Sequence, residues 1–247
     1  MSLGKCCISG FKHDGTPVGA IEQVDGVRTY VTLPKGDYDK TKAVLFLTDI
    51  FGIDTLPNGL LLADSYAANG YATYMPDLLN GDPVPMDAMK KGEFDLGAWF
   101  PHHGADVTRP PIDKVLRAMR EQGFTKVAAI GFCFGARYVV DLVLDNAIQA
   151  AMVAHPSLLE VPADIEKLKQ SSVPFLWNNA GEDHGGFNPD VQKQARAILE
   201  GSAAHKWLVW DKVDHGFAIR GDPSDETQRK AADGAFEATV QFFNDKL

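Results

Sequence analysis

The stretch "AAIGFCFGARY", residues 128–138, decides the fold that this sequence predicts. It places Cys133 in a Gly-x-Cys-x-Gly pattern, where the cysteine takes the serine position of the Gly-x-Ser-x-Gly nucleophile elbow. In an elbow the nucleophile stands on a tight, strained turn between a strand and a helix, and glycines two residues away prevent clashes. A strand-like run precedes Cys133 and a helix-like run follows it, so its surroundings are those of an elbow.

The pattern alone leaves a second interpretation of Cys133 open. Free cysteine is among the most buried residue types, so the thiol could be a small packing residue between two glycines. Candidate partners elsewhere in the chain are needed to favour catalysis over packing.

The side chains that would act with Cys133 follow two later strands. In chains with a nucleophile elbow, the acid and then the base come after the nucleophile. Asp183 comes just past the end of a strand-like run at 173–181, and His215 lies in the loop after another at 205–211. We predict that His215 takes the thiol proton and later protonates the leaving group, while Asp183 fixes the tautomer and orientation of the imidazole.

Asp214 and His184 are the local alternatives for these two roles. We prefer Asp183 because it follows its strand directly, whereas Asp214 is the sequence neighbour of the proposed base. Each residue alone could be an ordinary loop residue. Their joint occurrence at strand ends, in the expected order, favours a triad.

Two backbone N–H groups are predicted to form the oxyanion hole. One belongs to Phe134, directly after the nucleophile. The other belongs to Ile50, in the loop "TDIFG" that follows the apolar run "KAVLFLT". Its neighbour Asp49 would then lie at the mouth of the site.

The remainder of the chain alternates strand and helix signals. A hairpin is predicted at 18–34, around the turn signal Asp25-Gly26. The later expected strands are 42–52, 71–76, 126–131, 148–156, 173–181 and 205–211, and the expected helices are 56–69, 104–122, 134–145, 162–170, 189–200 and 224–245. This alternation predicts an α/β-hydrolase type of α/β fold, with a mostly parallel central sheet, helices on both faces and a site at the carboxyl ends of the strands.

One segment, residues 80–111, interrupts the alternation. It is rich in Pro, Gly and aromatic residues and has little regular period. Segments of this length without regular structure are uncommon unless they are functional or disordered. We therefore expect a single domain over residues 1–247 with a lid-like insertion at 80–111, the alternative being a plain surface excursion.

The negative net charge of the chain argues against nucleic acid and anionic membranes as partners. The 247 residues carry a net charge of -9, and no basic cluster with interleaved aromatics is present. Nucleic acid and anionic membrane surfaces both require clustered Lys and Arg, so neither is expected as a partner. No run approaches the ~18 apolar residues of a spanning helix.

The N-terminus and the cysteines indicate a reducing compartment. The opening "MSLGKCCISG" lacks the apolar run of a signal peptide. Three cysteines do not make a disulfide framework, and Cys6 and Cys7 are interpreted as structural. We expect a cytoplasmic protein. The C-terminal "DKL" resembles the Ser-Lys-Leu peroxisomal address but has Asp245 in place of the small residue.

Histidines and aromatics outside the triad allow further interpretations. His102 and His103 lack a third and fourth ligand at sensible spacing, so no metal is expected. Four aromatic residues could line an apolar pocket or belong to the core: Trp99, Phe100, Phe187 and Phe217.

With these motifs assembled, the chain resembles the dienelactone hydrolase family over about residues 15–245. The resemblance rests on "DIFG", "GFCFG", "GED" and "HGFAIR" in this order, and "CCISGFKHDGTPVG" is similar to the fungal and eukaryotic branch. It implies the triad Cys133, Asp183 and His215, and no cofactor.

The resemblance also implies roles for residues around the triad. The bacterial enzymes have a glutamate that helps to activate the thiol where this chain has the shorter Asp49. They bind the substrate carboxylate with arginines, and Arg220 lies one position beyond the usual spacing. His155, at the end of a predicted strand, could face the pocket or be a hydrogen-bonded loop histidine.

The sequence therefore predicts a cofactor-independent hydrolase of a small ester or lactone that acts through a thioester acyl-enzyme. Two alternatives use the same residues. One is thioester cleavage or acyl transfer on the same triad, and the other is a non-catalytic redox or ligand-binding protein with Cys133 as a sensing thiol. The expected partner is a small ester or lactone, and both a monomer and a homodimer stay open.

Overall fold

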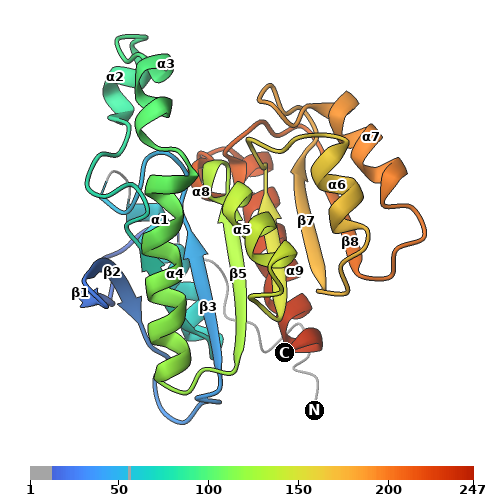
Figure 1. Ribbon diagram of the computed structural model, residues 1–247. Helices are drawn as coiled ribbons and strands as arrows, with labels where there is room; N and C mark the ends of the chain where they lie inside the picture. The colour runs from blue at the N-terminus through green and yellow to red at the C-terminus, as the bar shows by residue number, and fades with distance from the viewer. Residues whose placement is uncertain (1–12, 55–56) are drawn as a thin grey trace.

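The computed structural model describes residues 13–54 and 57–247 (Figure 1). Cys6 and Cys7, which are predicted to be structural, lie outside the described residues. The described chain forms an eight-stranded sheet in the order β1-β2-β4-β3-β5-β6-β7-β8, in which neighbours from β4 to β8 are parallel. Its strands are β1 (Ala20–Val24), β2 (Val27–Thr32), β3 (Lys42–Leu47), β4 (Ala72–Pro76), β5 (Lys126–Phe132), β6 (Ala150–Ala154), β7 (Phe175–Ala180) and β8 (His205–Trp210).

The predicted N-terminal hairpin is confirmed. β1 and β2 are antiparallel, with Val24 opposite Val27, and β2 continues antiparallel onto β4. The two turn residues, Asp25 and Gly26, have φ of 50° and 74°. Only Gly and, less often, Asp or Asn adopt this left-handed backbone readily, which explains the Asp-Gly signal.

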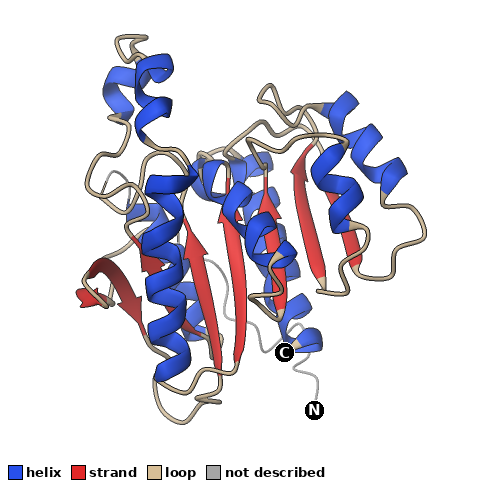
Figure 2. Ribbon diagram, viewed as in Figure 1, coloured by secondary structure: helices blue, strands red, loops and turns tan. Residues whose placement is uncertain are grey.

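Helices cover both faces of the sheet, as predicted. One apolar core lies between the sheet and α4 (Ala105–Glu121), α5 (Phe134–Leu144), α6 (Ala163–Leu168) and α7 (Pro189–Ile198). A second core lies between the opposite face and α1 (Pro57–Ala68), α8 (Phe217–Arg220) and α9 (Glu226–Lys246). Figure 2 shows α4, α5 and α6 in front of the strands and α9 behind them. The mostly parallel α/β architecture is therefore confirmed.

The structure differs from the sequence-based expectation in a buried turn after β3 and in a short additional helix. The apolar run 42–52 is not one strand, because β3 ends at Leu47 and a turn closed by a Gly52 N–H···O bond to Asp49 follows. The run continues past the strand because the turn itself is buried, with Phe51 only 7% exposed. The four-residue α8 was not predicted, since so short a helix has no detectable period.

The segment 80–111 contains more regular structure than its sequence indicates. It forms α2 (Met86–Lys90), α3 (Leu96–Trp99) and the 3₁₀ turn η2 (Phe100–His102). Residues 105–111 belong to α4, within the helix expected at 104–122, and Pro110 and Pro111 lie inside it. In Figure 1, α2 and α3 project beyond the carboxyl ends of the strands.

The carboxyl ends of β3 and β5 meet where the chain reverses its direction across the sheet. After β3 the chain adds β4 on one side, and it then returns to place β5 on the other. The register pairs Leu47, the last residue of β3, with Gly131 of the predicted elbow. Such a switch point is where open α/β sheets bind their ligands.

Candidate active site

Cys133 stands on a strained turn between β5 and α5. Its φ and ψ are 51° and -111°, outside the regions that L residues adopt easily. A Cβ on Gly131 would lie 2.7 Å from Val139 Cγ2, and one on Gly135 would lie 2.4 Å from the carbonyl oxygen of Leu47. Both glycine positions therefore exclude any side chain, which is the steric basis of the Gly-x-Cys-x-Gly pattern.

His215 is held by the carboxylate of Asp183. Its Nδ1 lies 3.1 Å from each carboxylate oxygen. The Asp183 side chain is fully buried, and its Oδ1 also accepts the N–H of Gly185 at 2.7 Å. The structure thus brings two residues from the ends of different strands into one hydrogen-bonded pair, with His215 partly open to solvent at 17%.

The environment of His215 favours its protonated form. Burial alone lowers the pKa of the imidazole, but hydrogen bonds to the side chains of Asp183 and Cys133 outweigh it and raise the pKa to about 9. An imidazole in this position is able to hold a proton that leaves the neighbouring thiol.

The two alternative residues, Asp214 and His184, lie together beside this pair. Asp214 Oδ1 accepts the backbone N–H groups of His184 and His215 at 2.9 and 2.6 Å, and its Oδ2 lies 3.0 Å from His184 Nδ1. Burial raises the pKa of Asp214, but these hydrogen bonds have a larger opposing effect, so the net result is a lowered pKa. Geometry therefore places Asp183, not Asp214, on the ring of His215.

The two predicted oxyanion donors lie on adjacent elements. Phe134 is the first residue of α5, so its N–H has no acceptor inside the helix. A Cβ on Gly135 would lie 2.5 Å from the carbonyl oxygen of Thr48, which shows how closely α5 begins against the end of β3. Ile50 follows two residues later, and its carbonyl accepts the N–H of Val84 at 2.9 Å.

Asp49 and Arg220 form a buried ion pair. Arg220 Nη1 bonds to Asp49 Oδ2, and the guanidinium carbon lies 4.9 Å from the centre of the Phe51 ring. Asp49 Oδ1 accepts the N–H of Phe51 at 3.0 Å. The two residues were expected to serve the thiol and a substrate carboxylate, and in this structure Asp49 is bonded to Arg220 and Phe51 rather than to Cys133.

His155 lies behind His215 in the interior. Its ring is completely buried, neither ring nitrogen has a hydrogen-bond partner among the described residues, and its centroid lies 4.8 Å from that of His215. Burial, the charge of His215 and the charge of Arg220 lower its pKa well below 6.5. Of the two interpretations offered by the sequence, a hydrogen-bonded loop histidine does not describe this ring.

Ser157 is a neighbour of the thiol that the sequence did not indicate. Its Oγ lies 3.5 Å from Cys133 Sγ, and its N–H donates to the Cys133 carbonyl at 3.0 Å. It belongs to the loop after β6, the strand beside β5. The order of the strands would have identified Ser157, because a loop that follows the strand next to β5 lies beside the elbow at the end of β5.

The aromatic residues of uncertain role separate into two groups. Trp99, Phe187 and Phe217 are at most 5% exposed and belong to the core, whereas Phe100 is 37% exposed. His103 stacks on Trp99 with centroids 3.7 Å apart. In the described ranges, no three His, Cys, Asp or Glu side chains are grouped as metal ligands would be, and no helix is long and apolar enough to cross a membrane.

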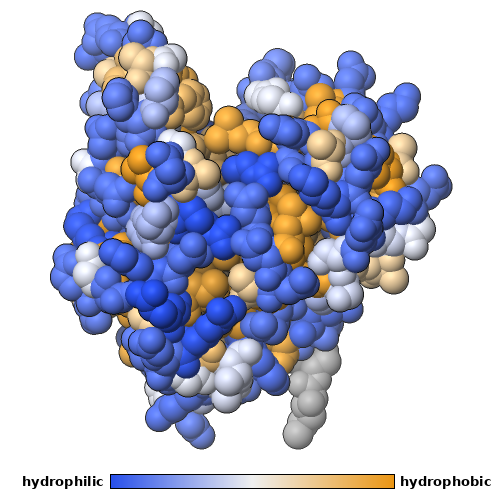
Figure 3. Space-filling model, viewed as in Figure 1, coloured by the Kyte–Doolittle hydropathy of each residue, from blue (hydrophilic) through white to orange (hydrophobic). Residues whose placement is uncertain are grey.

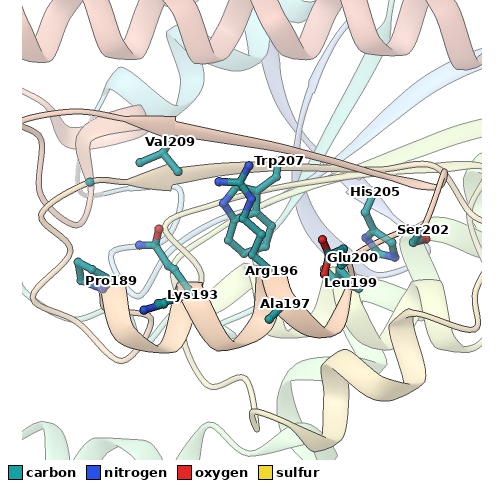
Figure 4. Close-up of a pocket in the computed structure, with 13 residues that line it drawn as sticks. Pro189, Lys193, Arg196, Ala197, Leu199, Glu200, Ser202, His205, Trp207 and Val209 are labelled. Carbon is teal, nitrogen blue, oxygen red and sulfur yellow. The ribbon is translucent and has the colours of Figure 1, made fainter.

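A groove of about 710 Å³ lies away from these residues, along α7 and β8. Figure 4 shows it between the basic side chains Lys193 and Arg196 of the helix and Trp207 and Val209 of the strand. None of the candidate catalytic side chains lines it.

Comparison with known proteins identifies the family of this chain. Residues 27–247 match the model of the dienelactone hydrolase family. "Hydrolase pyvD" of Aspergillus violaceofuscus is 34% identical over 98% of this chain and 96% of its own length, and "Dienlactone hydrolase 1" of Gibberella moniliformis is 29% identical over 97% and 92%. The crystal structure of a putative dienelactone hydrolase from Klebsiella pneumoniae superimposes with a TM-score of 0.73 at 18% identity, covering 92% of this chain and 98% of that one.

Proposed function

Since the chain belongs to the dienelactone hydrolase family, we propose that it hydrolyses a small carboxylic ester or lactone through a thioester on Cys133. The observation that carries the proposal is the strained Cys133 backbone beside a His215 ring that is bonded to the buried Asp183. The bond from Asp183 and the effect of Cys133 on the pKa of His215 support a base held ready for this thiol.

In the first half-reaction, Cys133 Sγ attacks the carbonyl carbon of the ester. His215 holds the proton that has left the thiol, and the N–H groups of Phe134 and Ile50 stabilise the oxyanion of the tetrahedral intermediate. When this collapses, the C–O bond of the ester breaks and the leaving oxygen receives the proton from His215. The products of this step are a thioester and a free alcohol, which in a lactone stays attached to the acyl group.

In the second half-reaction, water attacks the thioester carbonyl. His215 accepts a proton from the water, the same N–H groups bind the oxyanion, and the C–S bond breaks. The proton then returns to the thiolate as the carboxylic acid leaves. The reaction uses only groups of this chain and water.

The pairing of His215 with the buried Asp183 favours hydrolysis over a purely redox role for the thiol. A sensing thiol requires only an accessible thiolate, whereas turnover requires a base that is held in one tautomer and exchanges a proton twice. We also propose that residues 80–111 act as a lid of this single domain. Transfer of the acyl group to another acceptor would share the first half-reaction.

Acid-quenched mass spectrometry tests the proposal. With para-nitrophenyl acetate, the parent protein is expected to release nitrophenol and to carry one acetyl group on the peptide that contains Cys133. Cys133→Ala is expected to lose both signals. Full activity of Cys133→Ala would remove this residue from the mechanism, and acetylation without turnover would favour acyl transfer.

A further inference from the structure

We propose that a cleft between Phe100, Phe134 and Leu158 binds a neutral aromatic acyl group of the ester, an inference that rests on the proposed function. This acyl cleft has a volume of about 430 Å³ and lies between η2, the first turn of α5 and the loop after β6. Figure 3 shows apolar surface in the hollow below the projecting α2 and α3.

Two residues that line the acyl cleft are sequence neighbours of residues at the thiol. Phe134 is the residue after Cys133. Leu158 is the residue after Ser157, whose Oγ lies 3.5 Å from Cys133 Sγ. An acyl group bound to Sγ therefore has this cleft within reach.

Phe100 offers the acyl cleft an exposed aromatic ring, which packs on buried aromatic residues. The rings of Phe100 and Phe134 have centroids 6.5 Å apart at an interplanar angle of 37°, and Tyr138 packs on Phe134 at 5.4 Å. Trp99 packs edge-to-face on both phenyl rings, with centroid distances of 5.4 and 5.8 Å. Phe100 itself is 37% exposed, whereas the rings it packs against are buried. An aromatic ring of a ligand could therefore stack on the exposed part of Phe100, which its buried neighbours hold in place.

A leucine at position 158 is unexpected, because its backbone conformation is unfavourable for leucine and its side chain is largely exposed. Its φ is 61°, a left-handed conformation in which Gly or Asn would be less strained. Its side chain is also 46% exposed, so folding gains little from its apolar atoms. An exposed apolar residue held on strained backbone next to a nucleophile points to contact with a ligand.

The charges around the acyl cleft disfavour an anionic acyl group. Arg137 bonds to both Asp141 and Asp164, so its charge is already compensated, and Glu160 adds a further carboxylate. At the thiol itself, Arg220 is paired with Asp49. A carboxylate on the substrate would therefore meet uncompensated negative charge in this cleft.

The size and lining of the cleft fit one or two aromatic rings. An apolar cavity of roughly 150 Å³ holds one benzene molecule. The open volume of about 430 Å³ is large enough for a substituted or fused ring system. The occupant is thus a neutral aryl or similarly flat apolar acyl group.

Three para-nitrophenyl esters test the inference: the acetate, the benzoate and the para-carboxybenzoate. The parent protein is expected to show a kcat/KM for benzoate at least about tenfold above that for carboxybenzoate. Leu158→Asp is expected to lower the benzoate-to-acetate ratio of kcat/KM by about tenfold, mainly through KM, because it removes apolar contact and adds charge. Aspartate tolerates the backbone at this position, so the variant should fold.

Val209→Asp is the matched control. Val209 is 44% exposed, close to the 46% of Leu158, but lies on β8 in the other groove. It should leave the benzoate-to-acetate ratio at the parent value. Equal kcat/KM for benzoate and carboxybenzoate, or an unchanged ratio in Leu158→Asp, would overturn the inference.

A binding measurement keeps this inference separate from the proposed function. Benzamide is neutral and contains no ester. Calorimetry is expected to show weaker binding of benzamide to Leu158→Asp than to the parent or to Val209→Asp. If the parent hydrolyses none of the three esters, the proposed function fails. The cleft is then still supported by that loss of benzamide binding, or refuted by equal binding to all three proteins.

Discussion

The imidazole ring of His155 lies edge-on against the ring of His215, with centroids 4.8 Å apart. The inner ring is completely buried and its nitrogens have no hydrogen-bond partners in residues 13–54 and 57–247, whereas the outer ring is bonded to Asp183. Two histidines in contact thus have opposite preferences for a proton, since the pKa of His155 is lowered and that of His215 is raised.

The first prediction concerns stability in acid. Because the pKa of His155 lies well below its unfolded value of 6.5, the unfolded chain binds the proton more tightly. The free energy of unfolding should therefore fall as the pH drops from 6.5 to about 5. Urea titrations across this range should show a shallower fall for His155→Asn, while His102→Asn, at an exposed position, keeps the parent slope.

The second prediction concerns stability in base. The folded protein holds the proton of His215 up to a pKa of about 9, against 6.5 in the unfolded chain. This contribution is complete below pH 6.5 and is lost as the pH rises toward 9, for a total on the order of 3 kcal/mol. Asp183→Asn should flatten this part of the profile because it removes the main group that raises the pKa. An equally steep loss in that variant would contradict the assignment.

The third prediction separates the two candidate acids. Asp183→Asn should lower kcat by about 10³ to 10⁴-fold, as expected when the imidazole loses its orienting carboxylate. Asp214→Asn should cost less than about tenfold, because Asp214 holds backbone N–H groups and not the ring. Steady-state kinetics of both variants on one ester distinguish the two candidates. A larger loss of kcat in Asp214→Asn than in Asp183→Asn would make Asp214 the acid.

The fourth prediction concerns the elbow. Gly135→Ala should destabilise the protein by more than about 3 kcal/mol, or prevent folding, because the new Cβ would lie 2.4 Å from a carbonyl oxygen. Gly186→Ala is the control, since a Cβ there meets no atom within 4 Å. Thermal unfolding of both variants measures the difference. A Gly135→Ala protein as stable as the control would mean that α5 can shift away from β3.

The fifth prediction concerns the Asp49–Arg220 pair. Asp49→Asn leaves a nearly buried guanidinium without its partner and should lower the free energy of unfolding by about 2–4 kcal/mol. Arg220→Gln in the same chain should recover much of this loss. If Asp49 also serves the thiol, Asp49→Asn shifts the pH–rate profile of ester hydrolysis. An unchanged profile would make the residue structural.

The sequence predicts local structure and the order of elements well because their signals are short in range. The elbow, the Asp25-Gly26 hairpin and the alternation of strands and helices all depend on residues a few positions apart. The Asp49–Arg220 pair joins residues 171 positions apart, so no local pattern indicates it. The proximity of Ser157 to the thiol likewise depends on strand order, which periodicity does not contain.

Short and irregular elements were harder to predict for a related reason. α2, α3 and α8 have four or five residues each, too few for a helical period to be detected. The exposure of Leu158 on a left-handed backbone has no signature in its residue type, since leucine ordinarily indicates a core position.

Residues 80–104 lie between β4 and α4, outside the strands of the sheet. β4 lies on the far side of β3 from β5, so this segment can change in length or composition without altering the strands that carry Cys133, Asp183 and His215. An exchange of this segment between family members would transplant one wall of the acyl cleft, provided that the hydrogen bond from the N–H of residue 84 to the Ile50 carbonyl is kept. Diversification of substrate range along such a lineage then requires no redesign of the nucleophile.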